Sequence, residues 1–324
     1  MGKTAFIFPG QGAQYVGMGQ DFYDTMPVCR QVMDKAGEIT GLDIPKICFT
    51  ENEEIHITEY TQIAMLSVEA AILKALEQEG LVPDVSAGLS LGEYGACIAS
   101  RVLSLEDAFF VVRKRGIFMQ EAVPSGGAMS AVMGTDAAVI EQACQETEGI
   151  VSIANYNCPG QIVITGEERA VAEASEKLKE LGARRIVPLN VSGPFHSAML
   201  TGAGEKLAEV LEHVTVGEPK IPYAANVTAQ YVTEASQAKD LLIRQVSSSV
   251  KWQQCVETMI ADGVDTFVEI GPGKTLSGFM RKICRDVKML NIQTTEDFTK
   301  AVETLKNRVQ KHKRDVNNRK SEGI

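Results

Sequence analysis

The sequence lacks the features of secreted and membrane proteins. It has seven cysteines, an odd number, and no C-x-x-C pair, a pattern that favours reduced thiols over a disulfide framework. No apolar run approaches the roughly 18 residues of a membrane-spanning helix. The apolar stretch after Lys3 is too short for the core of a secretory signal peptide. We therefore expect a cytoplasmic protein with no membrane-bound part.

The sequence also lacks an excess of basic residues. It contains 32 lysines and arginines against 42 aspartates and glutamates, for a formal net charge of −10. This balance argues against a general nucleic-acid binder, because such proteins usually present a basic face to the phosphates. With 324 residues, 44% of them hydrophobic, the chain can bury the core of one large domain or of two ordinary ones.

Two glycine-rich stretches are similar to nucleotide-binding loops but match neither pattern. In 9–19 the third glycine of a dinucleotide fingerprint is replaced by Tyr15. In 271–275 the first glycine of a phosphate-binding loop would fall at Val268, inside an expected strand. Neither stretch supports hydride transfer or nucleotide hydrolysis. We expect tight turns at strand ends, no cofactor and no bound metal.

Short apolar runs alternate with helical patterns over most of the chain. Strands are expected at 3–10, 82–88 and 265–271, and helices at 61–81, 91–102, 105–123, 202–214 and 251–263. Strand, turn and helix in repetition indicate an α/β fold with a largely parallel sheet covered by helices.

The stretch from about 127 to 190 has a different order. Strands are expected at 128–134, 150–157, 161–166 and 184–190, with helices at 136–149 and 168–182. This βαββαβ order is that of a ferredoxin-like unit. We therefore expect a discontinuous large domain over 1–125 and 196–300, an inserted ferredoxin-like domain over 126–195, and a basic C-terminal tail over 301–324.

Ser90 lies in "GLSLG", which fits the G-x-S-x-G pattern. Such a serine is either an ordinary turn residue or a nucleophile on a sharp strand-to-helix turn, where flanking glycines let the neighbouring backbone pass. The expected strand before it and helix after it favour the second interpretation. Backbone N–H groups at such a turn can stabilise a developing negative charge, and Gln11 is a candidate to supply one of them.

A serine nucleophile needs a base, and the chain has only four histidines. His56 lies in an acidic, loop-like stretch, His213 near a helix end, and His312 in the basic tail. His196 follows an expected strand, the position where α/β sheets build their sites, and is the best candidate. No carboxylate between Ser90 and His196 is a plausible third member, which suggests a Ser–His dyad whose imidazole is oriented by something else.

Several motifs occur together in a characteristic order. They are "FPGQGAQ", "GLSLGEY", "RGIFMQEAVP", "NYNCPGQIVITG", "GPFHSAM", "RQVSSSVKW" and "EIGPGKTLSGF". From about residue 4 to 290 the chain resembles the malonyl-CoA:acyl-carrier-protein transacylases of type II fatty acid synthesis. The resemblance implies a large α/β-hydrolase-like domain with a parallel sheet and a ferredoxin-like insert.

The resemblance also implies roles for individual residues. Ser90 would be the nucleophile and His196 the base, with the N–H groups of Gln11 and Leu91 as the oxyanion hole. Arg115 would hold the malonyl carboxylate, and the backbone carbonyl of Gln245 would orient His196. Further positions expected near the substrate are Gln62, Asn157 and Phe195, the last resembling malonyl-selective members.

The expected reaction transfers a malonyl group from malonyl-CoA to acyl carrier protein through a malonyl-serine, in a monomer with no nucleic-acid or membrane partner. Three alternatives remain: a serine esterase or thioesterase, a non-catalytic module that docks acyl carrier protein, and an acyltransferase of a polyketide pathway. Because free histidine has a pKa of about 6.5, we expect acylation to decline below about pH 6.

Overall fold

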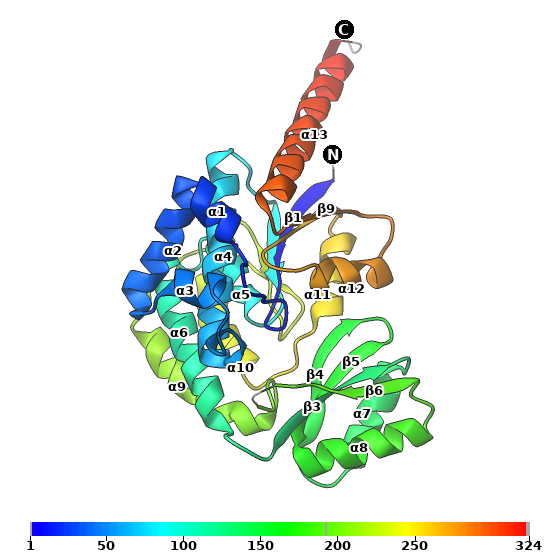
Figure 1. Cartoon of the computed structure of the whole chain (residues 1–324). Helices are drawn as coiled ribbons and strands as arrows, with labels where there is room; N and C mark the ends of the chain where they lie inside the picture. The colour runs from blue at the N-terminus through cyan, green and yellow to red at the C-terminus, as the bar shows by residue number, and fades with distance from the viewer. Residues whose placement is uncertain (1, 192, 322–324) are drawn as a thin grey trace.

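The chain forms two β-sheets with helices packed around them (Figure 1). The structure is a computed structural model that describes residues 2–191 and 193–321, with the backbone alone for 311–321. The larger sheet has the strand order β10-β9-β1-β2-β7-β8, and all its pairings are parallel except that of β7 with β8. Its strands are β1 (Lys3–Phe8), β2 (Val85–Gly88), β7 (Tyr223–Ala224), β8 (Tyr231–Val232), β9 (Val264–Ile270) and β10 (Lys288–Ile292).

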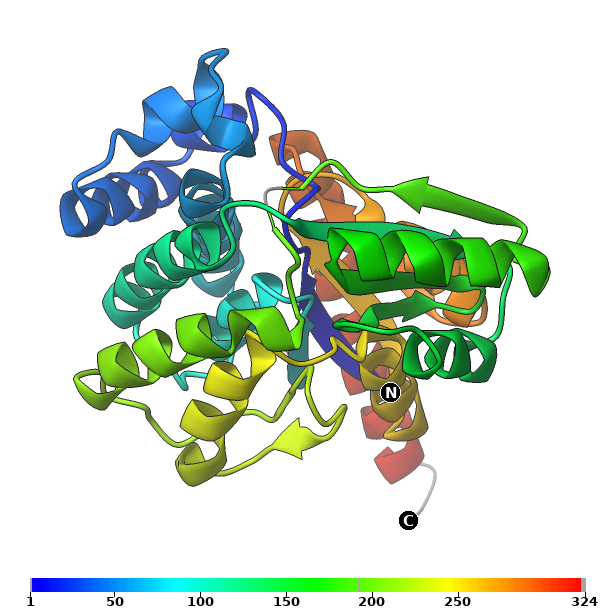
Figure 2. The same cartoon turned by 90° about the horizontal axis from the view of Figure 1, so that it is seen from below.

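The smaller sheet is antiparallel throughout, with the order β4-β5-β3-β6. Helices α7 and α8 contact each other and pack on the sheet (Figures 1 and 2), over a hydrophobic core of its own. The elements are β3 (Gly127–Met133), α7 (Ala137–Gln145), β4 (Val151–Cys158), β5 (Gln161–Glu167), α8 (Glu168–Glu180) and β6 (Arg185–Pro188). The expected mixed α/β fold, with one largely parallel sheet and a separate antiparallel one, is therefore confirmed.

The remaining helices pack around the larger sheet. They are α1 (Gln20–Thr25), α2 (Pro27–Thr40), α3 (Ile44–Phe49), α4 (Thr58–Gln78), α5 (Gly92–Ala99), α6 (Leu105–Ala122), α9 (Thr201–Glu212), α10 (Ala235–Gln245), α11 (Trp252–Ala261), α12 (Thr275–Ile283) and α13 (Thr295–Ser321), with short 3₁₀ helices at Glu54–His56 and Ala198–Leu200. Most of α4 is buried on every side, as expected of a helix that is apolar around its whole circumference. No helix among the described residues is long and apolar enough to cross a membrane.

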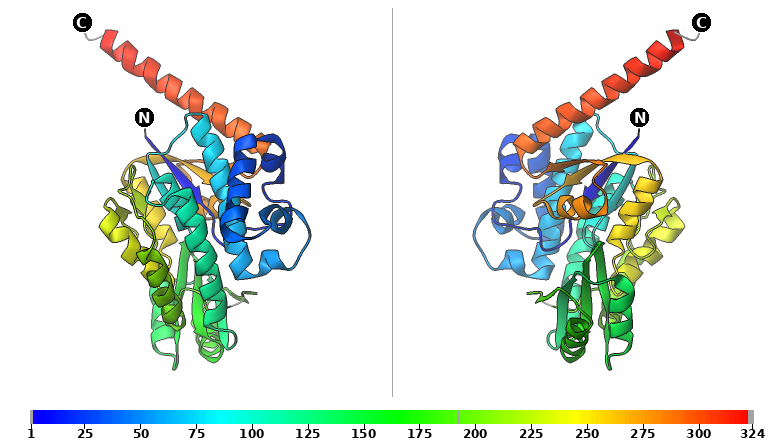
Figure 3. Two further views of the ribbon diagram at one scale, coloured as in Figure 1. Left: turned by 90° about the vertical axis from the view of Figure 1, so that its left-hand side faces the viewer. Right: turned by 90° about the vertical axis from the view of Figure 1, so that its right-hand side faces the viewer.

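Helix α13 runs away from the body of the molecule (Figures 1 and 3). Its first half is anchored, because Phe298, Ala301 and Leu305 are buried in the main core. The tail that the sequence places at 301–324 therefore begins inside a packed helix. Its last residues, 322–324, lie outside the described part of the chain.

The parallel arrangement brings three loops to one edge of the larger sheet. Strands β1, β2 and β9 are neighbours and run in the same direction, so their carboxyl ends coincide. The loops that follow them begin at Pro9, Leu89 and Gly271. This edge is where open α/β sheets usually place their binding sites, and both glycine-rich stretches of the sequence lie here as turns.

Candidate active site

Ser90 occupies a strained turn between β2 and α5. Its φ of 54° lies in the left-handed region, which side chains other than glycine rarely adopt. The flanking glycines are required by sterics. A Cβ on Gly88 would lie 1.9 Å from the backbone of Gly92, and one on Gly92 would lie 2.1 Å from the carbonyl oxygen of Phe8. The G-x-S-x-G pattern therefore marks a close crossing of three backbone segments.

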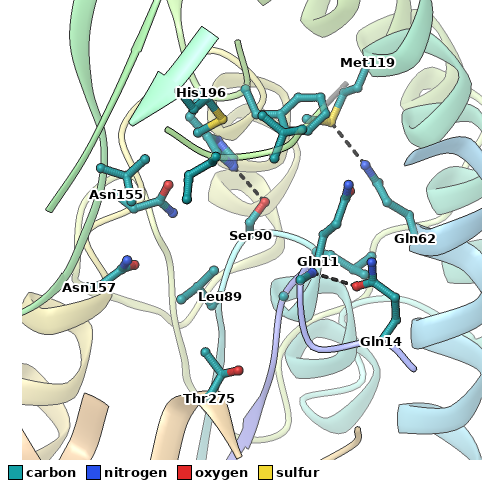
Figure 4. A pocket seen from close by; sticks show the side chains of 18 of the residues that line it. Gln11, Gln14, Gln62, Leu89, Ser90, Met119, Asn155, Asn157, His196 and Thr275 are labelled. Atoms are coloured by element: carbon teal, nitrogen blue, oxygen red, sulfur yellow. Dashed lines mark hydrogen bonds between the residues drawn. The ribbon is translucent and has the colours of Figure 1, made fainter. Parts of the chain in front are cut away.

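The turn brings the hydroxyl of Ser90 to an imidazole that is distant in sequence. Ser90 Oγ lies 2.7 Å from Nε2 of His196 (Figure 4). The other ring nitrogen, Nδ1, lies 2.8 Å from the backbone oxygen of Gln245. A carbonyl oxygen only accepts hydrogen bonds, so the proton sits on Nδ1 and Nε2 is left to accept the serine proton. The orienting group is thus a carbonyl where a hydrolase triad has a carboxylate.

The environment of His196 favours its neutral form. The residue is buried, and burial together with the positive charge of Arg115 lowers the pKa of the imidazole to about 4, although backbone contacts with Gln245 and Ser248 oppose the shift. The expected decline of acylation below about pH 6 assumed an unperturbed histidine. The structure corrects that value downward, because desolvation disfavours the imidazolium.

Arg115 places a buried cation beside the same serine. The residue projects from α6 and is only 1% exposed. Its Nη1 donates to Oε1 of Gln62 at 2.6 Å, and its Nη2 donates to Oε1 of Gln245 at 2.9 Å and to Ser90 Oγ at 3.2 Å. The guanidinium also lies over the ring of Tyr94, 5.5 Å from its centroid. Within the described residues no carboxylate forms an ion pair with it.

Two backbone N–H groups are available near the hydroxyl. Those of Gln11 and Leu91 have no acceptor in the described part of the chain. The loop that carries Gln11 touches the serine turn, since a Cβ on Gly10 would lie 2.5 Å from the carbonyl oxygen of Leu89. Leu91 directly precedes the first residue of α5, where the helix dipole adds to the positive potential.

A pocket of about 450 Å³ joins these groups (Figure 4). Every site residue proposed from the sequence lines it except Gln245, which lies behind Arg115 and His196. The lining residues proposed from the sequence are Gln11, Gln62, Ser90, Leu91, Arg115, Asn157, Phe195 and His196. Asn157 belongs to β4, so the pocket lies between the larger and the smaller sheet.

Three further residues of this region, which the sequence did not predict, are Asn226, Glu93 and His56. Asn226 accepts from the backbone N–H of Ser90 at 2.7 Å and donates to the carbonyl of Gly88 at 2.7 Å, holding both sides of the turn. Glu93 is buried beneath it, and a lone carboxylate within the apolar helix α5 was a signal for this. His56 lines the pocket, although its acidic surroundings suggested no role.

Comparison with known proteins agrees with this geometry. The family model for the acyl transferase domain matches residues 5–318. A malonyl CoA-acyl carrier protein transacylase of Bacillus subtilis is 44% identical over 311 residues, which cover 94% of this chain and 98% of the relative. The chain therefore belongs to the malonyl CoA-acyl carrier protein transacylases within the acyl transferase family.

Solved structures support the same assignment. The crystal structure of the transacylase MCAT from Streptococcus pneumoniae is 44% identical and superposes with a TM-score of 0.90, covering 93% of this chain and all of that one. A malonyl-transacylase in complex with a type II PKS acyl-carrier protein is 37% identical, with a TM-score of 0.90 and coverage of 93% and 99%.

Proposed function

We propose that the protein transfers the malonyl group from malonyl-CoA to the phosphopantetheine thiol of acyl carrier protein, through a malonyl ester on Ser90. One observation carries the proposal: the Ser90 hydroxyl lies between a neutral imidazole nitrogen at 2.7 Å and, at 3.2 Å, a buried guanidinium that has no ion-pair partner in the described part of the chain. The first activates a nucleophile. The second binds a carboxylate at the far end of a short acyl group.

In the first half-reaction His196 Nε2 takes the proton of Ser90, and Oγ bonds to the thioester carbonyl carbon of malonyl-CoA. The carbonyl oxygen becomes an oxyanion that accepts from the N–H groups of Gln11 and Leu91. The carbon–sulfur bond then breaks, and the leaving sulfur takes the proton from His196. Coenzyme A departs as a thiol and the malonyl group stays on Ser90.

The second half-reaction repeats these steps with a different thiol. His196 takes the proton of the phosphopantetheine thiol, whose sulfur attacks the malonyl ester. The oxyanion forms again in the same hole, the carbon–oxygen bond breaks, and Ser90 recovers its proton from His196. Because coenzyme A leaves before the carrier thiol attacks the malonyl-enzyme, the kinetics are of the ping-pong type.

Selection of malonyl over acetyl is assigned to Arg115. Its planar guanidinium can hold a carboxylate with two parallel hydrogen bonds. An acetyl group leaves this buried cation without its anion, which penalises the wrong substrate as well as favouring the right one. We assign Gln62 to orienting the guanidinium, and Phe195 and Asn157 to bounding the acyl site, in line with their place in the pocket.

The same proposal extends to the organisation of the chain. We describe 1–125 with 196–300 as an α/β-hydrolase-like domain, 126–195 as a ferredoxin-like insert and 301–324 as a basic tail. The antiparallel order β4-β5-β3-β6, with both helices on the sheet, supports the insert. The free thiols of all seven cysteines support a cytoplasmic location, and a site built by one chain supports a monomer.

The experiment that tests the function compares two acceptors of the malonyl group, the thiol of acyl carrier protein and water. Wild-type protein and Ser90→Ala are incubated with malonyl-CoA and holo acyl carrier protein, and both malonyl carrier protein and free malonate are measured by mass spectrometry. We expect Ser90-dependent malonylation of the carrier with little free malonate. Release of malonate without carrier malonylation would instead identify a thioesterase, and carrier binding without either product would identify a docking module. Fatty-acid and polyketide carriers are compared in the same assay.

A further inference from the structure

The proposed mechanism leaves one buried carboxylate near the nucleophile without a role. Glu93 lies on α5, one turn after Ser90, and is fully buried. Its Oε2 accepts from Nε2 of Gln245 at 2.6 Å and from the backbone N–H of Asn226 at 3.1 Å, while its Oε1 has no partner among the described residues. Burying a carboxylate is costly, so its position beneath the site calls for an explanation.

The contacts of Glu93 lead to the side-chain amide of Gln245. An amide has one accepting oxygen and one donating nitrogen, and its two orientations are distinguished only by its partners. Nε2 of Gln245 faces Oε2 of Glu93 and, at 2.9 Å, the backbone oxygen of Ser90, both of which only accept. Oε1 of Gln245 faces Nη2 of Arg115, which only donates. All three partners therefore demand the same orientation, and Oδ1 of Asn226, 3.4 Å from Nε2, is a weaker fourth that agrees with it.

The reversed amide would lose every one of these contacts. Its NH₂ group would meet the guanidinium of Arg115, donor against donor, and its oxygen would meet the oxygens of Glu93 and Ser90. Oε2 of Glu93 makes the shortest of the three contacts, at 2.6 Å. Without Glu93 the NH₂ group of Gln245 retains only the backbone oxygen of Ser90 and, at 3.4 Å, Oδ1 of Asn226. The loss of its shortest acceptor weakens the preference for the orientation that supports Arg115.

We propose that Glu93 is a positioning residue for substrate selection: it fixes the side-chain amide of Gln245, which in turn holds Arg115 ready for the carboxylate of the acyl group. The chain of contacts runs from Glu93 Oε2 through the Gln245 amide to Arg115 Nη2, with both links at or below 2.9 Å. This inference rests on the proposed function. It adds that a residue with no access to the substrate contributes to the choice between malonyl and acetyl.

The relative loss of malonyl and acetyl transfer distinguishes this positioning role from a purely structural one. Arg115 binds the carboxylate in the ground state and in the transition state alike, so loosening it raises KM for malonyl-CoA more than it lowers kcat. Transfer of acetyl does not use that contact. Loss of Glu93 therefore lowers malonyl transfer selectively, whereas general damage to the fold lowers the transfer of both groups in proportion.

The experiment measures kcat/KM for malonyl-CoA and acetyl-CoA with holo acyl carrier protein as acceptor. We expect Glu93→Ala to lower the malonyl-to-acetyl ratio about 10-fold, the effect of losing one short buried hydrogen bond. Glu93→Gln retains an acceptor for Gln245 and causes a smaller fall. The ratio is independent of the folded fraction, so partial misfolding does not obscure the result. Glu69→Ala is the matched control, because Glu69 is equally buried but contacts neither Gln245 nor Arg115, and it leaves the ratio unchanged.

A second arm uses Arg115→Ala as the background. There Glu93→Ala has no further effect on the ratio, because the residue through which it acts is gone. An unchanged ratio in Glu93→Ala alone, with a wild-type protein that forms its malonyl-enzyme, overturns the positioning role and leaves the function intact. A wild-type protein that forms no malonyl-enzyme overturns the function itself.

Discussion

The Nη2 atom of Arg115 lies 3.2 Å from Oγ of Ser90. In the proposed mechanism this distance limits the length of the acyl group. With its thioester carbon at Ser90 and its carboxylate on Arg115, the acyl group has room for only a short spacer between the two. The contact between Arg115 and Ser90 therefore links the proposed acylation of the serine to the proposed choice of a short acyl group with a terminal carboxylate.

Replacing Arg115 by alanine removes the proposed partner of the malonyl carboxylate. We expect malonyl transfer to fall by about 100-fold or more, in the range found when a site loses a charged hydrogen-bond partner of its substrate. Acetyl transfer survives or rises, because the penalty for leaving a buried guanidinium unpaired disappears. Steady-state kcat/KM with both CoA esters checks this. Arg113→Ala on the same helix is the control, since Arg113 pairs with Glu59 outside the pocket. Equal losses for both acyl groups in Arg115→Ala would show that Arg115 does not bind the malonyl carboxylate.

The pH profile of acylation follows from the buried imidazole. The base works only when neutral, and burial and Arg115 lower the pKa of His196 to about 4. The neutral form therefore dominates from neutral pH down to about pH 5, and the rate declines as pH approaches 4. Single-turnover acylation by malonyl-CoA, quenched and measured by mass spectrometry, gives the profile, with circular dichroism at each pH to verify folding. A midpoint near pH 6.5 would mean that the imidazole is solvated in the free enzyme.

The glycines of the serine turn are required by backbone contacts, so alanine there should be poorly tolerated. In Gly88→Ala the new Cβ would meet the backbone of Gly92 at 1.9 Å. We expect a loss of about 3 kcal/mol in the free energy of unfolding, from overpacking that only a backbone shift can relieve. Gly278→Ala is the control, because nothing lies within 4 Å of its added Cβ in the middle of α12; it should stabilise by about 0.5–1 kcal/mol. Urea denaturation measures both, and equal stabilities would contradict the tight crossing.

A second buried carboxylate makes stability depend on pH. Burial, with the nearby negative charge of Glu269, raises the pKa of Glu69 well above its usual value, and neither of its oxygens has a hydrogen-bond partner among the described residues. The folded protein thus holds a proton that the unfolded chain releases above about pH 4.5. Stability contributed by this group is complete below that pH and declines as pH rises through the folded-state pKa, by about 1 kcal/mol per pH unit.

In Glu69→Gln this dependence is absent. The variant gains stability over the wild type as pH rises from 5 to 8, and the difference vanishes near pH 4. Urea denaturation at each pH gives the two slopes. Parallel slopes for wild type and variant would show that Glu69 is ionised in the folded protein and stabilised by a partner.

Sequence motifs predicted those parts of the site whose geometry depends on residues close together in the chain. The glycines around Ser90 were readable because the steric demand of a sharp turn falls on adjacent residues. His196 was proposed because the chain has only four histidines, although the strand before it, β6, belongs to the antiparallel sheet and not to the parallel one. The contact of Arg115 with Gln245 joins residues 130 positions apart, and no spacing rule reaches that far, so both residues entered through family resemblance alone.

The misses have equally physical causes. Glu93 was passed over because a carboxylate on a helix normally faces water, although it is the lone carboxylate of the apolar helix α5, which is buried along its whole length. Asn226 lies in a loop after a two-residue strand, which is too short to carry a periodic signal. Helices α1 and α3 were not assigned, because six residues are too few to show a helical period. The pKa of His196 depends on its burial, which sequence does not report.

The central claim, that Ser90 carries the acyl group, is tested most directly by intact mass spectrometry after mixing the protein with malonyl-CoA alone. The account predicts that the wild type gains the mass of a single malonyl group, located on the peptide that contains residue 90, and that holo acyl carrier protein removes it. Ser90→Ala gains nothing. An adduct of the same size on Ser90→Ala, or its absence from a folded wild type, would contradict the account.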